Sequence, residues 1–167
     1  MSNKKGFTLV ELLVTIGIIG ILATVTVVSV GGARGKARDS KRLSDIKQMQ
    51  SALELYSSDV GGFYPGGTDA LIGETDGYTV ICEDGFVTVA NKANCTSTYL
   101  SPIPKDPTNS GALIYKYTAK TAAGGACAAG ATDCTTYSIT FELESKSGNL
   151  LPGKLHTATP TGITPGT

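Results

Sequence analysis

The chain has 167 residues, which is enough for one compact domain and a membrane segment but leaves no room for a second sizeable core. Its 14 lysine and arginine residues balance its 14 aspartate and glutamate residues, so the chain as a whole has no long-range attraction for polyanions such as nucleic acids. With 21 glycines and no tryptophan, its composition is typical of a small β-rich domain with many turns and argues against a large aromatic core.

The N-terminal part combines a short basic segment with a long apolar one. Residues 1–6 contain Lys4 and Lys5, and residues 7–30 are almost continuously apolar. As a helix, the apolar segment would measure about 36 Å, which exceeds the roughly 30 Å of membrane hydrocarbon. The apolar core of a secretory signal is shorter. We therefore predict a leader at 1–6, followed by a retained transmembrane helix at 7–30.

Glu11 is the only ionisable residue of the apolar segment 7–30. A charged side chain at the centre of a membrane span costs roughly 2.5–3.5 kcal/mol even on insertion-based scales, so such a residue usually has a partner or a function. We expect no group within the segment to pair with it. The alternative is that Glu11, near the helix start, simply reaches the membrane interface. We favour a functional carboxylate.

Charges return at Arg34, and the helix is expected to continue as an amphipathic segment over 31–62. Apolar residues recur there at spacings of three and four, which define one face of a helix; they are Leu43, Ile46, Met49, Leu53, Tyr56 and Val60. No proline interrupts the segment before Pro65, and the pair Gly61-Gly62 is a suitable stop.

Basic residues follow the apolar segment closely; they are Arg34, Lys36, Arg38, Lys41 and Arg42. They outnumber Lys4 and Lys5, and this count alone would place the following domain in the cytoplasm. The basic run could contact lipid headgroups or DNA. We favour a solvated helix face on which Asp39 and Asp45 pair locally with these cations.

The residues beyond the helix predict a β-rich head over 63–147. Four segments have the length and composition of strands; they are 78–83, 86–90, 113–119 and 135–143, with an Asp84-Gly85 turn between the first two. In the last segment alternate residues are apolar, namely Tyr137, Ile139, Phe141 and Leu143. This pattern is typical of an antiparallel sheet that packs on a helix, so the predicted fold class is α+β.

A proline-rich connection over 99–107 and a C-terminal segment over 148–167 complete the chain. The C-terminal segment is rich in glycine, threonine and proline, and we predict a flexible tail. His156, the only histidine, lies in this tail without an evident partner and is interpreted as an exposed residue.

The four cysteines, Cys82, Cys95, Cys127 and Cys134, all follow the apolar segment, and no C-x-x-C pair suggests zinc. Disulfides are favoured over free thiols, which would place the head in an oxidising compartment. The sequence-adjacent pairs would each contribute about 3 kcal/mol by closing short loops, but the two other pairings stay open. We expect no cofactor and no metal. The sequence has no G-x-S-x-G or H-E-x-x-H motif, and we predict no enzyme activity.

The segment KKGFTLVELL, residues 4–13, closely resembles the class III signal of type IV prepilins and type II secretion pseudopilins. The resemblance implies that a prepilin peptidase cuts between Gly6 and Phe7 and methylates the new N-terminus at Phe7. It also implies that Glu11 meets the terminal amine of a neighbouring subunit, so that two charges that are costly to bury neutralise each other. The implied partners are other copies of the chain in a helical filament, an assembly ATPase and a membrane platform protein.

The resemblance extends over the amphipathic helix to Pro65, and segment 99–107 is similar to a loop of major pseudopilins. Two features depart from the pattern: residues 7–30 lack the proline common in pilus pilins, and the tail lacks the acidic calcium loop of major pseudopilins. The favoured function is a type IV pilus subunit, with the head outside the cytoplasmic membrane and later in an extracellular filament. The alternatives are a pseudopilin of a secretion or DNA-uptake system and a membrane-tethered binding domain.

Overall fold

A computed structural model describes residues 6–74, 77–111 and 113–167, except for the side chains of residues 26–30 and Val89. The chain divides into two compact units, Met1–Ala37 and Arg38–Thr167. Within the described residues, no helix combines the length and the apolarity needed to cross a membrane. The predicted span 7–30 includes residues 26–30, whose side chains lie outside the described set. The predicted leader, apart from Gly6, also lies outside it.

Helix α1, Leu9–Asp59, is the element expected from the apolar run and the amphipathic pattern. It ends in a capping arrangement in which the Gly62 N–H donates to the carbonyl of Ser57 at 2.7 Å. Gly61, at the turn, has a φ of 83°, a left-handed conformation that glycine adopts at little cost. The glycine pair therefore stops the helix as predicted.

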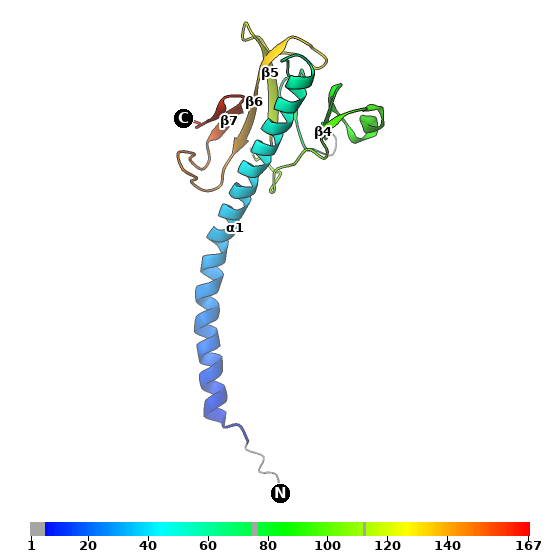
Figure 1. Cartoon of the computed structure of the whole chain (residues 1–167). Coiled ribbons are helices and arrows are strands. Elements are labelled where there is room, and N and C mark those ends of the chain that lie inside the picture. Colours follow the sequence, from blue (N-terminus) through cyan, green and yellow to red (C-terminus); the bar gives the residue numbers. More distant parts are fainter. Residues whose placement is uncertain (1–5, 75–76, 112) are drawn as a thin grey trace. The chain divides into compact units, whose positions relative to one another are not determined.

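The second unit contains two antiparallel sheets (Figure 1). The larger sheet has the order β1-β5-β6-β7-β8 and the smaller one has the order β3-β2-β4. The strands of the larger sheet are β1 Ala70–Leu71, β5 Lys116–Thr121, β6 Cys134–Glu142, β7 Leu155–Thr159 and β8 Gly162–Thr164. Those of the smaller sheet are β2 Val80–Cys82, β3 Gly85–Val87 and β4 Thr98–Leu100, with a short 3-10 helix, Val89–Asn94, before β4.

The core lies between the apolar face of α1 and the larger sheet. On the helix, Ile46, Met49 and Leu53 are at most 1% exposed. On β6 and just beyond it, the four residues singled out by alternation, Tyr137, Ile139, Phe141 and Leu143, are equally buried. Within the sheet, Ile139 of β6 pairs with Tyr117 of β5 on one side and with Ala158 of β7 on the other. The predicted α+β architecture, with a helix packed on an antiparallel sheet, is confirmed.

The turn between β2 and β3 lies one residue earlier than predicted. Cys82 pairs with Gly85, so Glu83 and Asp84 form the turn and Gly85 begins the strand. A Cβ on Gly85 would lie 3.1 Å from Pro65 Cβ, and its φ is 89°, so this position favours glycine. The predicted segment 86–90 also ends early, at Val87, and β4 overlaps the start of the segment 99–107, which the sequence indicated was only a connection.

The C-terminal segment is not the flexible tail that its composition predicts. β7 pairs with β6, and β8 pairs with β7, so the segment extends the larger sheet. His156 is fully buried there, not exposed as predicted. Its Nδ1 accepts the Gly166 N–H at 3.0 Å, so the hydrogen on Nε2 points to the Leu151 carbonyl 2.9 Å away. The histidine thus ties the end of the chain to the sheet.

Candidate assembly site

The N-terminal half of α1 exposes apolar side chains around its whole circumference. Phe7 is 84% exposed and even Val14, the least exposed of the large apolar residues over 7–25, is 50% exposed. They are Phe7, Leu9, Val10, Leu12, Leu13, Val14, Ile16, Ile18, Ile19, Ile21, Leu22 and Val25. A helix that is apolar on all sides is stable only inside a membrane or a protein assembly. This segment therefore requires an apolar environment that its own unit does not supply.

Glu11 and Thr8 form a reciprocal cap at the start of this helix. The backbone N–H and the hydroxyl of Thr8 donate to Glu11 Oε2 at 2.9 and 2.7 Å, and the Glu11 N–H approaches Thr8 Oγ1 at 3.3 Å. This is the capping box, in which a threonine and a glutamate three residues later satisfy free backbone donors. Thr8 therefore gives Glu11 a hydrogen-bond partner that was not foreseen, but as a neutral side chain it supplies no counter-charge. The T-x-x-E spacing was a sequence signal for this pair.

The processing position predicted from the sequence precedes the helix. Gly6 and Phe7 are both exposed and lie outside regular secondary structure. A Cβ placed on Gly6 would meet no heavy atom of the described residues within 4 Å, apart from its chain neighbours, so the backbone has open space here. The geometry leaves the Gly6-Phe7 bond accessible and places it two residues before α1 begins.

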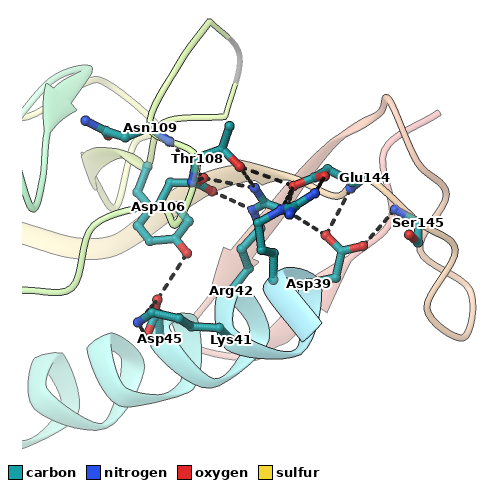
Figure 2. Close-up of polar contacts among 11 residues, drawn as sticks. Asp39, Lys41, Arg42, Asp45, Asp106, Thr108, Asn109, Glu144 and Ser145 are labelled. Atoms are coloured by element: carbon teal, nitrogen blue, oxygen red, sulfur yellow. Dashed lines mark hydrogen bonds and ion pairs between the residues drawn. The ribbon is translucent and has the colours of Figure 1, made fainter. Parts of the chain in front are cut away.

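Arg42 lies at the centre of a buried charge network in the second unit (Figure 2). Its Nε and Nη2 donate to the two carboxylate oxygens of Asp106 at 2.6 and 3.0 Å, the two-bond contact that suits a planar guanidinium. Its Nη1 lies 2.7 Å from Asp39 Oδ1 and 2.8 Å from Glu144 Oε1. Burial alone would lower the pKa of Arg42, but hydrogen bonds to the three carboxylates outweigh burial and raise the pKa.

Backbone groups and a second arginine complete the network. Asp39 accepts the N–H groups of residues 144 and 145 at 3.0 and 2.7 Å, and Asp106 accepts those of residues 108 and 109 at 2.7 and 3.2 Å. Arg38 donates to both oxygens of Glu144, with Nε 2.8 Å from Oε1. The network thus fastens α1 to the segment before β5 and to the segment after β6 (Figure 2).

The basic run is therefore only partly the solvated face that the sequence predicts. Local pairing is present, because Arg42 contacts Asp39 and Lys41 Nζ lies 3.2 Å from Asp45. Asp39, Arg42 and Asp45 are buried, however, and not solvated. Tyr115 also contacts Asp45, with its hydroxyl 3.4 Å from Oδ2, and burial together with this carboxylate raises the pKa of Tyr115. The distant partners Asp106 and Glu144 were not foreseen.

Acid is expected to weaken the fold through Glu144. Hydrogen bonds from Arg38 and then Arg42 lower the pKa of Glu144 from 4.5 to about 2, despite the opposing effect of burial. Since the folded state favours the ionised form, this contribution to the free energy of unfolding is complete above pH 4.5 and is lost as the pH falls to about 2. Urea unfolding at about pH 7, 4 and 3 should show a free energy of unfolding that falls as the pH is lowered.

The matched variants for this experiment are Glu144→Gln and Glu142→Gln. Glu144→Gln should unfold more easily at pH 7 and should show a smaller loss of stability between pH 4.5 and 2. Glu142 forms no ion pair among the described residues, so Glu142→Gln should keep the profile of the unmodified chain. Identical acid profiles for the unmodified chain and Glu144→Gln would contradict the assignment.

The four cysteines form two disulfides between sequence-adjacent partners. Cys82 is bonded to Cys95, with 5.9 Å between their Cα atoms, and Cys127 is bonded to Cys134, with 6.0 Å. In the described part of the chain, the two clusters with metal-ligand residue types are Cys82-Glu83-Cys95 and Cys127-Asp133-Cys134. Each contains one of these bonded pairs, and metals bind the thiolate form of cysteine. Both clusters are therefore disulfide sites.

Comparison with known proteins finds similarity to pilins and pseudopilins. Residues 1–27 match the prokaryotic N-terminal methylation motif. The type II secretion system core protein G of Aeromonas hydrophila is 41% identical over 73 residues, covering 42% of this chain and 50% of that protein. The core protein G of Escherichia coli is 43% identical over 58 residues, covering 35% and 40%. The type IV wide pilus major component PilA4 of Thermus thermophilus is 41% identical over 59 residues, covering 35% and 45%.

These similarities are partial. The chain spans half or less of the length of each of these three relatives. No solved structure matches the chain. The motif over residues 1–27 and the similarity to both core protein G and PilA4 confirm the resemblance of this chain to the type IV pilin and type II secretion pseudopilin family.

Proposed function

We propose that this protein is a structural subunit of a type IV pilus that polymerises through the N-terminal half of α1. The observation that carries the proposal is the exposed apolar surface over residues 7–25, which contains a single carboxylate, Glu11. Many copies of such a helix bury this surface against one another in a filament. The role is structural and not enzymatic.

Processing at the N-terminus would prepare the chain for assembly. A prepilin peptidase would cut between Gly6 and Phe7 and methylate the amine of Phe7. Glu11 would then exchange its contact with Thr8 for the terminal amine of a neighbouring subunit. This exchange is favourable in an apolar environment because a paired carboxylate and ammonium cost less to bury than either charge alone. The similarity of residues 1–27 to the methylation motif supports this step.

Before assembly, residues 7–30 would anchor the protein in the cytoplasmic membrane as a single pass. The rest of the chain, from the amphipathic helix at 31–62 onward, would lie outside. The two disulfides support this orientation, because disulfides persist in oxidising compartments. An assembly ATPase in the cytoplasm and a membrane platform protein would then move the subunit into the filament.

A pseudopilin of a type II secretion or DNA-uptake system is the second candidate. The similarity to core protein G of two species favours it. Filaments that can be sheared from the cell surface would indicate a pilus, whereas loss of protein secretion on deletion would indicate a pseudopilin. A membrane-tethered binding domain has less support, because a tether needs no carboxylate at Glu11.

The experiment that tests the proposal is N-terminal processing in the presence of a prepilin peptidase. The mature chain should begin at N-methylated Phe7. A chain that still carries residues 1–6 would contradict the proposal.

A further inference from the structure

A cavity of about 270 Å³ lies in the second unit, between the C-terminal end of α1 and the turn that joins β2 to β3. Three of its lining residues are aromatic: Tyr56 from α1, Tyr78 from the segment before β2, and Phe86 from β3. Small residues of the segment 129–132 form another wall. Its volume suits the polar end of one long side chain or a small organic molecule.

The aromatic rings of the cavity are held in place by other rings. Tyr78 and Phe86 lie with their centroids 5.6 Å apart at a tilt of 45°, and Phe86 packs edge-on against the buried Tyr117 at 4.6 Å. Tyr56 meets Tyr99 edge-on at 5.7 Å. Because these contacts fix the rings before any ligand arrives, binding would require little ordering of side chains.

The charged groups of the cavity are all acidic. Glu83 and Asp84 line it, and none of its lining residues is a lysine, arginine or histidine. Both carboxylate oxygens of Glu83 are occupied, since they accept the N–H groups of Thr96 and Ser97. Asp84 is exposed and forms no hydrogen bond or ion pair among the described residues. The cavity is thus lined by three aromatic side chains and by one carboxylate that has no counter-charge among the described residues.

Two covalent constraints keep the walls of the cavity together. The disulfide at Cys82 fixes the residue just before the Glu83-Asp84 turn. The Cys127–Cys134 disulfide closes the loop that supplies the wall at 129–132. The site is therefore preformed by the parts of the head that the disulfides restrain.

We propose that this cavity binds an organic cation, an alkylammonium or a guanidinium group, with aromatic faces around the cation and Asp84 as its counter-charge. Aromatic faces attract cations through the ring quadrupole, and a neighbouring carboxylate adds a direct electrostatic attraction. The cation could belong to a free amine or to a lysine or arginine side chain of a second copy. Binding at this site does not depend on the proposed filament.

The test uses the full chain in a neutral detergent and follows its amide resonances by NMR. The probes are n-butylammonium, n-butylguanidinium and the uncharged n-butanol. The two cations should bind saturably and shift resonances of Tyr78, Phe86 and Asp84, and n-butanol should not. Binding of n-butanol as tight as that of n-butylammonium would overturn the proposal.

Two variants separate the carboxylate from general surface charge. Asp84→Asn keeps the shape of the turn but removes the counter-charge, and it should weaken binding of both cations roughly two- to fivefold. Asp133→Asn removes an exposed acid of the neighbouring disulfide loop that does not line the cavity, and it should leave binding unchanged. Equal affinities for Asp84→Asn and the unmodified chain would contradict the assignment.

A dilution series without probe distinguishes the two sources of the cation. Shifts of the same resonances with protein concentration would assign the cation to a basic side chain of a second copy. Spectra that are independent of concentration, together with binding of the probes, would assign it to a free amine.

Discussion

Replacing Glu11 by alanine should abolish filament assembly while leaving the removal of residues 1–6 intact. In the proposed assembly step, Glu11 supplies the charge that neutralises the terminal amine of a neighbour, so without it that amine is buried unpaired. The cost of an unpaired charge in an apolar environment amounts to several kcal/mol, which is enough to stop polymerisation. Filament yield by electron microscopy and the mass of the mature chain measure the two properties separately.

The capping box requires controls, because Glu11 also contacts Thr8. Glu11→Gln retains an oxygen that can accept the Thr8 N–H but has no charge, and it should fail to assemble as alanine does. Thr8→Val removes the hydroxyl contacts and keeps the charge, and the loss of a cap typically costs about 1 kcal/mol. It should reduce the yield only modestly. Filaments formed normally by Glu11→Gln would show that the carboxylate charge is not required.

Replacing Arg42 by methionine should destabilise the head by about 3–5 kcal/mol, the usual cost of removing one partner from a buried ion pair. Arg42 is fully buried, and its loss would leave Asp39 and Asp106, which are at most 3% exposed, without their cation. Two carboxylates would then remain close together in a site that water hardly reaches. Guanidinium unfolding of the purified chain in detergent measures the change.

Lys41 provides the matched control at the adjacent position of the same helix. Its side chain is 56% exposed and pairs with Asp45, so Lys41→Met should cost about 1 kcal/mol or less. Arg42→Lys keeps the charge but loses the two-bond contact with Asp106, and its stability should lie between the other two. If Arg42→Met and Lys41→Met were equally stable, the network would not be what fastens α1 to the sheet.

The features that the sequence predicted correctly are those with a local pattern. Apolar spacing along α1 predicted the buried face at Ile46, Met49 and Leu53, and alternation along β6 predicted the buried face of the sheet. The glycine pair after the helix marked its end. The cap formed by Thr8 and Glu11 was not predicted, although its T-x-x-E spacing is an equally local pattern.

The features that the sequence did not predict depend on partners far along the chain. The inward residues of β7 are His156 and Ala158, a polar and a small residue, so this strand lacks the apolar alternation that marks β6. It becomes a strand because the edge of β6 supplies its hydrogen bonds. Arg42 meets Asp106 across 64 residues, and no spacing rule on the helix identifies such a partner.

The most direct test of the central claim is the intact mass and the N-terminal sequence of the chain expressed with and without an active prepilin peptidase. With the peptidase, we expect a chain that has lost residues 1–6, begins at Phe7 and carries one added methyl group. Without it, the chain should begin at Met1 or Ser2. A chain that keeps residues 1–6 alongside a peptidase that processes a known prepilin in the same cells would contradict the account.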